Sequence, residues 1–181
     1  TNIGLMLADS RYVTIANIDD RRSPEFLEES LKQLSENKNA SLIYSDCIVT
    51  NIPNEKFVDS KLNGELFEHS LYSFSKENMV KCLPGPMPFW DTAINEKCGF
   101  FHENYKFAND WEMWLRAVKN DFIFYKNKKI LGLYLAGGRS DGNFNLQQRK
   151  EEAEIFFKFS SIFGENYQKY YNYFDQFRRI S

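Results

Sequence analysis

Cysteine, histidine and long apolar runs are all scarce in this chain of 181 residues. The three cysteines, Cys47, Cys82 and Cys98, lie far apart and form no Cys-x-x-Cys pair. This spacing argues against a disulfide framework or a cysteine zinc site and favours a reducing compartment. His69 and His102 have no partner at metal-ligand spacing, so we predict surface or structural roles for both. No apolar run approaches the length of a membrane-spanning helix.

An excess of one charge is also missing, since 23 basic and 25 acidic residues leave a net charge of −2. This balance argues against a nucleic-acid partner. The glycine pair Gly137-Gly138 is too short to indicate a phosphate-binding loop, and no Ser/His/Asp or Cys/His arrangement stands out. Aromatic residues, in contrast, are abundant, with 17 Phe and 10 Tyr. They predict an aromatic-rich core or groove in a chain long enough for one domain.

One stretch combines a strand, two carboxylates and a helix start. Residues 12–16 are β-branched or aromatic and uncharged, which predicts a buried strand. The strand runs into Asn17-Ile18-Asp19-Asp20, and Ser23-Pro24-Glu25 is typical of a helix start. Carboxylates in this position lie where open α/β sheets bind ligands, and a divalent cation would relieve their mutual repulsion. A solvated turn before a helix explains the same residues.

The rest of the chain predicts an α/β fold whose helices gather at the C-terminus. We expect a helix at residues 24–37 with Phe26, Leu27, Leu31 and Leu34 on its apolar face, and a strand at 41–50. A surface loop at 51–64 and one or two short helices within 65–80 follow. We then predict helices at 91–97 and 111–120, a strand pair within 121–134 and a glycine-rich loop at 136–143. Helices at 146–163 and 167–178 complete the pattern, so residues 1–140 form a main unit and 141–181 a helical extension packed on it.

Two further stretches are candidates for a site. Residues 84–90 contain three prolines and a glycine, which predict a rigid extended segment ending at Trp90. Asn109-Asp110 opens the clearest helix of the chain, and its helical spacing predicts that Trp111 and Trp114 are buried. Asp110 alone is most simply an N-cap, although a carboxylate at a pocket edge can also accept a proton from a hydroxyl. The three tryptophans are either core residues or a surface for stacking on sugar rings.

Taken in order, these motifs resemble the C-terminal two-thirds of a family-2 nucleotide-sugar glycosyltransferase domain with the GT-A fold. Residues 2–13 are similar to the family's lead-in, N-x-G-x-x-x-A-x-G-x-Y-I. Asn17-Ile18-Asp19-Asp20 resembles the metal motif D-x-D-D, with Asn17 in place of the first aspartate. Residues 99–103 and 109–116 resemble G-x-F-D-E and E-D-W-x-x-W-L-R, with Asn109 in place of the glutamate. Three motifs in the right order make the resemblance fairly specific.

The resemblance implies an inverting transferase that moves a sugar from a nucleoside-diphosphate donor to a hydroxyl of a glycan or lipid-linked acceptor. Asp110 would be the catalytic base, and Asp19 and Asp20 would bind Mg²⁺ or Mn²⁺, with Asn17 and Arg139 near the donor. Pro88, Trp90, Asn109 and Trp111 would contact substrate. The implied setting is surface polysaccharide or glycan synthesis, in the cytoplasm or at the inner face of the membrane.

The family's nucleotide-binding strands have no counterpart here, so we expect a partial GT-A (Rossmann-like) mixed sheet flanked by helices. Activity would then belong to a longer protein. An exposed sheet edge would favour pairing with a second copy of the chain as a homodimer. The alternative function is a non-catalytic, degenerate glycosyltransferase-like module for binding or assembly.

Overall fold

A computed structural model gives the fold and describes residues 1–60, 65–66, 72–137 and 145–180. The helices are α1 Asn2–Leu7, α2 Phe26–Glu36, α3 Phe57–Ser60, α4 Ala93–Cys98, α5 Asn109–Lys119, α6 Leu146–Lys158 and α7 Glu165–Arg178, with 3₁₀ turns η2 Glu77–Val80 and η3 Ser160–Ile162. The strands are β1 Tyr12–Thr14, β2 Arg21–Arg22, β3 Ala40–Thr50, β4 Glu65–Leu66, β5 Phe89–Asp91 and β6 Ile123–Leu135.

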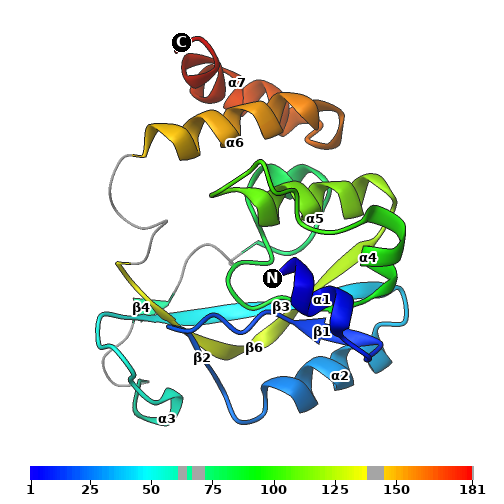
Figure 1. Cartoon of the computed structure of the whole chain (residues 1–181), viewed down its shortest axis with the longest axis vertical. Helices are drawn as coiled ribbons and strands as arrows, with labels where there is room; N and C mark the ends of the chain where they lie inside the picture. The colour runs from blue at the N-terminus through cyan, green and yellow to red at the C-terminus, as the bar shows by residue number, and fades with distance from the viewer. Residues whose placement is uncertain (61–64, 67–71, 138–144, 181) are drawn as a thin grey trace.

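These strands form one mixed sheet in the order β1-β5-β3-β6-β2, with β4 paired to β3. The central strands β3 and β6 run parallel, and the other pairs are antiparallel. Helices cover both faces, as a parallel pair requires. In Figure 1, α2 lies on one side of the sheet, α4 and α5 lie on the other, and α6 and α7 stack beyond α5.

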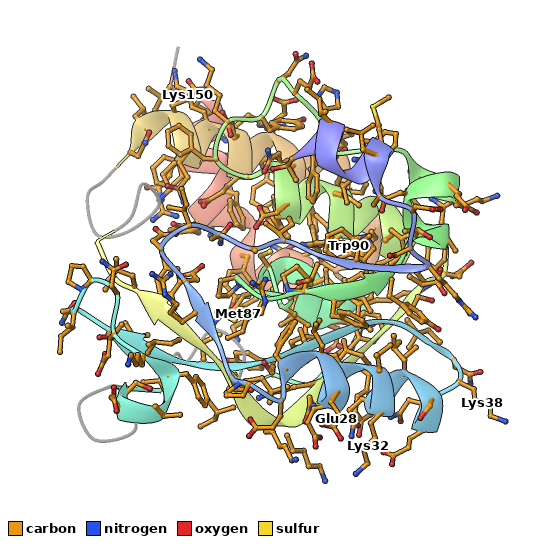
Figure 2. All side chains as sticks on the ribbon, turned by 60° about the horizontal axis from the view of Figure 1, so that its bottom comes forward. Glu28, Lys32, Lys38, Met87, Trp90 and Lys150 are labelled. Atoms are coloured by element: carbon orange, nitrogen blue, oxygen red, sulfur yellow. The ribbon has the colours of Figure 1, made fainter. Side chains whose placement is uncertain are left out.

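Two apolar cores follow from this layering. Alternation along β5 sends Phe89 into the smaller core beside α2 and Trp90 into the larger core beneath α5, α6 and α7. Met87 belongs to the smaller core, and Figure 2 shows Met87 and Trp90 inside the molecule while Glu28 and Lys32 point outward from α2. Among the described residues, both faces of the sheet are therefore covered along its centre.

Most predicted elements are present with shifted ends. The helices α2, α4, α5 and α7 and the strands β1 and β3 lie where the pattern placed them. The α/β class with helices at the C-terminus is confirmed. The apolar face of α2 needs correction, because Leu27 and Leu31 are 54% and 45% exposed while Phe26 and Leu34 are buried. The helix is rotated so that Ser30 faces the sheet between those two residues.

Four other element predictions differ from the structure. The strand pair at 121–134 is one strand, β6, whose pairing with β3 skips from Asn127 to Ile130, so the polar Lys128-Lys129 is a bulge and not a hairpin turn. The loop at 51–64 contains the short helix α3. Within 65–80 the structure has β4 and η2, and residues 67–71 lie outside the described part. The helix at 146–163 ends at Lys158 and continues as η3.

Candidate active site

The loop between β1 and β2 is fixed by the Asp20 carboxylate. Asp20 is only 6% exposed. Its Oδ2 accepts a hydrogen bond from Asn17 Nδ2 at 2.8 Å, and its Oδ1 accepts one from the Leu135 N–H at 3.2 Å. Burial raises the pKa of Asp20 above its ordinary value, and the bonds from Asn17 and Leu135 oppose that rise. Asp20 thereby ties the loop after β1 to the end of β6.

The divalent-cation site predicted at Asp19 and Asp20 does not fit this geometry. Asp19 is exposed, whereas both oxygens of the buried Asp20 already accept hydrogen bonds. Within the described residues, no group of three or more His, Cys, Asp or Glu side chains is placed to hold a metal ion. The prediction for Asp20 is corrected to a structural link, and we derive no chemical step through a metal.

Asp110 lies in the first turn of α5, two residues after the N-cap position. The N-cap is Ala108, which has no side-chain oxygen, so the N-cap interpretation of Asp110 is wrong. Asp110 Oδ1 accepts from the Trp111 N–H at 2.7 Å, and Oδ2 accepts from the Cys82 thiol at 3.7 Å. Burial is the main cause of a raised pKa at Asp110, and these two bonds counteract it. A carboxylate with a raised pKa is a better proton acceptor at neutral pH.

The thiol that contacts Asp110 is itself held in its protonated form. Burial raises the pKa of Cys82 well above its ordinary value, and the negative charge of Asp110 adds to the rise. Cys82 therefore acts as a hydrogen-bond donor here and not as a thiolate nucleophile. Its position places the segment before β5 directly against the start of α5.

Asn17 and Asp110 both line two adjoining cavities. The larger cavity has a volume of about 810 Å³ and the smaller one about 190 Å³, and both residues line both of them. Gly85, Pro86 and Phe107 also line both cavities. Residues 93 positions apart in the sequence, both picked out by their motifs, thus face one space large enough for a small-molecule substrate.

The predicted substrate contacts divide into two groups. Pro88 and Asn109 line the smaller cavity, and Trp111 lines the larger one. Trp90 must be corrected, because it is 0% exposed and its Nε1 donates to Asn95 Oδ1 at 2.8 Å. Its ring packs edge-on against Trp114, so Trp90 is a core residue. Arg139, predicted near the donor, lies outside the described residues.

The sequence pattern missed one wall of the larger cavity. The helices α6 and α7 contribute Arg149, Glu152, Lys169, Tyr170 and Tyr173 to its lining. Arg149 forms an ion pair with Glu152 at 2.6 Å. The predicted positions of these helices indicated only that they pack on the main unit, because no motif marks the side of a helix that faces a cavity. An i, i+3 ion pair beside a tyrosine cluster was the available signal.

No protein-family model and no curated protein matches this chain. Among solved structures, residues 1–349 of S. aureus TarS match with a TM-score of 0.63 and 14% identity, over 94% of this chain and 50% of that chain. The same part of TarS in complex with UDP gives the same values. A longer TarS structure gives a TM-score of 0.63 and 15% identity, over 94% of this chain and 30% of that one. TarS is a glycosyltransferase, so this chain has a glycosyltransferase-like fold and spans half of the shorter TarS structure.

A helix that crosses a lipid bilayer must be both long and apolar. No helix within residues 1–60, 72–137 and 145–180 combines these two properties.

Proposed function

We propose that this chain is part of an inverting glycosyltransferase of family 2 with the GT-A fold. It would transfer a sugar from a nucleoside-diphosphate donor to an acceptor hydroxyl in glycan synthesis. The observation that carries the proposal is the shared cavity of Asn17 and Asp110, in which Asp110 is a half-buried carboxylate of raised pKa. The UDP complex of the similarly folded TarS supports a nucleotide-sugar donor.

In the proposed reaction, Asp110 removes the proton of the acceptor hydroxyl as the hydroxyl oxygen attacks the anomeric carbon of the sugar. The bond from that carbon to the diphosphate oxygen breaks on the opposite face, and the diphosphate leaves with the electron pair. Lys81 and Lys169 bring positive charge to the larger cavity, which suits substrates that carry phosphate. Asn17, Pro88, Asn109 and Trp111 are the proposed substrate contacts.

The test is Asp110→Asn in the full-length protein, assayed by UDP release from a panel of UDP-sugars with sugar acceptors. Loss of a general base should reduce turnover by about 10²–10⁴-fold. UDP binding, measured by calorimetry, should stay unchanged because Asp110 acts on the acceptor. Asp9→Asn, in the exposed turn after α1, is the control and should retain full turnover. Wild-type turnover in Asp110→Asn would remove Asp110 as the base.

One observation favours a second function, a non-catalytic binding or assembly module. In the motif stretch, an amide replaces the first carboxylate, and this amide is bonded to Asp20 Oδ2. Because the Asn17 amide already forms a hydrogen bond within the protein, it is less available to contact a sugar donor. If the full-length protein binds UDP but releases none from any UDP-sugar tested, this second function leads.

A further inference from the structure

Side chains on one face of α6 form hydrogen bonds and an ion pair with the segment that precedes and begins α5. Gln147, Glu151, Glu154 and Lys158 follow one another at helical spacing of four, three and four residues. Glu154 Oε1 accepts from the Tyr105 hydroxyl at 2.7 Å. Lys158 Nζ donates to Glu112 Oε1 at 2.9 Å, and the Glu112 side chain is fully buried. These contacts span residues 105–112, with the catalytic-base candidate in their middle.

Glu151 makes the central contact. It is 3% exposed, and its Oε2 accepts from the N–H groups of Phe107 at 2.8 Å and Ala108 at 3.2 Å. Its Oε1 accepts from the Lys106 N–H at 3.1 Å and from Gln147 Nε2 at 3.2 Å. A carboxylate that takes three backbone N–H bonds makes strong charge-assisted contacts. It also lies at the positive end of the α5 dipole.

The start of α5 needs this help because it lacks a cap of its own. The N-cap Ala108 offers no side-chain acceptor for the free N–H groups of the first turn. Asp110 Oδ1 accepts from the N–H of the adjacent Trp111, so that bond holds its geometry only while the first turn is formed. If residues 106–108 loosened, the Asp110 carboxylate would lose its fixed position in the cavity.

We propose that Glu151 is a positioning residue that sets the Asp110 carboxylate for proton removal by clamping residues 106–108 from α6. This inference rests on the proposed function for the role of Asp110. It makes the C-terminal helical extension part of the catalytic machinery, although Glu151 itself touches neither cavity among the lining residues. A displacement of about 1 Å at a reacting group can reduce rate by up to about 10²-fold.

The experiment compares Glu151→Gln, Glu151→Asp and the control Glu165→Gln in the full-length protein. Glu165 is an exposed carboxylate in the first turn of α7 and is not among the lining residues of the two cavities, so its variant should keep wild-type turnover. UDP release should show a kcat about 10- to 100-fold lower in Glu151→Gln, with the KM for the UDP-sugar within about twofold. Glu151→Asp, which keeps the charge, should recover part of kcat.

Native-state hydrogen exchange tests the clamp without activity. The amides of Phe107 and Ala108 should be protected in the wild type and exchange faster in both Glu151 variants, while the β3 amides stay protected. Unchanged exchange at residues 106–108 would overturn the clamp. Faster exchange with wild-type kcat would overturn the positioning role. If Glu151→Gln does not fold, the Glu151→Asp comparison decides both points.

Failure of the proposed function is separable from failure of this inference. Full turnover in Asp110→Asn removes the base, and with it any positioning role, whatever Glu151 does. Hydrogen exchange would still report whether Glu151 holds residues 106–108. Reduced turnover in Asp110→Asn together with wild-type kcat in Glu151→Gln would instead leave the proposed function in place and refute the positioning residue alone.

Discussion

At the residue scale, the ionised Asp110 carboxylate lowers the stability of the folded protein, because burial removes it from water. Burial raises its pKa, so the folded chain holds the Asp110 proton over a pH range in which the unfolded chain has released it. Stability therefore falls as pH rises through this range. The full cost is present above the raised pKa of Asp110, and it disappears below the ordinary pKa of aspartate.

Asp110→Asn should accordingly stabilise the protein at pH 7 while it lowers turnover. The amide can still accept from the Trp111 N–H through its oxygen, and it carries no charge to desolvate. Urea denaturation at pH 7 should give a higher free energy of unfolding, and the gain should vanish near pH 3 for protein that still folds there. Asp9→Asn should show no such pH-dependent gain. Lower stability of Asp110→Asn at pH 7 would contradict this account.

At the element scale, the packing of the segment before β5 against β6 depends on one glycine, Gly132. A Cβ built on Gly132 would lie 2.2 Å from Met87 Sδ and 2.9 Å from Cys47 Sγ. Cys47 lies on β3 and pairs in register with Gly132, so the strand backbone cannot move away without breaking the parallel ladder. The close packing of Met87 over this glycine fills the smaller core.

Gly132→Ala should lower the free energy of unfolding by about 1–3 kcal/mol, because an extra methyl overpacks this core. Thermal and urea unfolding measure the change. Gly4→Ala in α1 is the matched control, since a Cβ there would enter open space as far as the described residues show. Its stability should stay unchanged or rise by up to about 1 kcal/mol through helix propensity. Equal effects of the two substitutions would mean that the Met87 side chain moves away from the added methyl group at little cost in free energy.

At the scale of the whole molecule, an aromatic stack joins the C-terminal helices to the main unit. Phe174 of α7 stacks on Phe156 of α6, with ring centroids 4.3 Å apart, and on Trp111 of α5 at 6.1 Å. Trp111 also donates its Nε1 hydrogen to the Met79 carbonyl at 2.8 Å. The larger core is thus continuous from β3 to α7, which predicts that residues 1–140 and 141–181 unfold together.

Phe174→Ala should destabilise the whole protein by about 3–5 kcal/mol, the cost of removing a buried phenylalanine. Calorimetry should show a single transition in the wild type and a single transition at a lower temperature in the variant. In each protein, signals from residues 1–140 and from residues 141–181 should change at the same temperature. Ile180→Ala, at an exposed position past α7, should change stability by less than about 0.5 kcal/mol. Two separate transitions would show instead that the helical extension folds independently.

Local patterns predicted a large part of this fold. The helical spacing of Trp111, Trp114 and Val118 and the apolar run of β3 report which side of an element meets apolar neighbours, and that is a local property. The wrong predictions fall where a neighbouring element, and not the local sequence, decides the structure. Lys128-Lys129 has the composition of a turn, yet pairing with β3 continues on either side of it. Leu27 and Leu31 have the right spacing to be buried, but the sheet faces Ser30.

The sequence by itself determined the α/β class, the order of most elements and the two motif stretches that hold Asn17 and Asp110. Short-range chemistry specifies those features: apolar spacing, proline, and polar residues at the ends of strands and helices. Only the tertiary structure decided which motif side chains reach a cavity. It buried Trp90, engaged Asp20 with Leu135, and brought Glu151 to the start of α5. Such roles depend on contacts between residues distant in sequence, which no local pattern encodes.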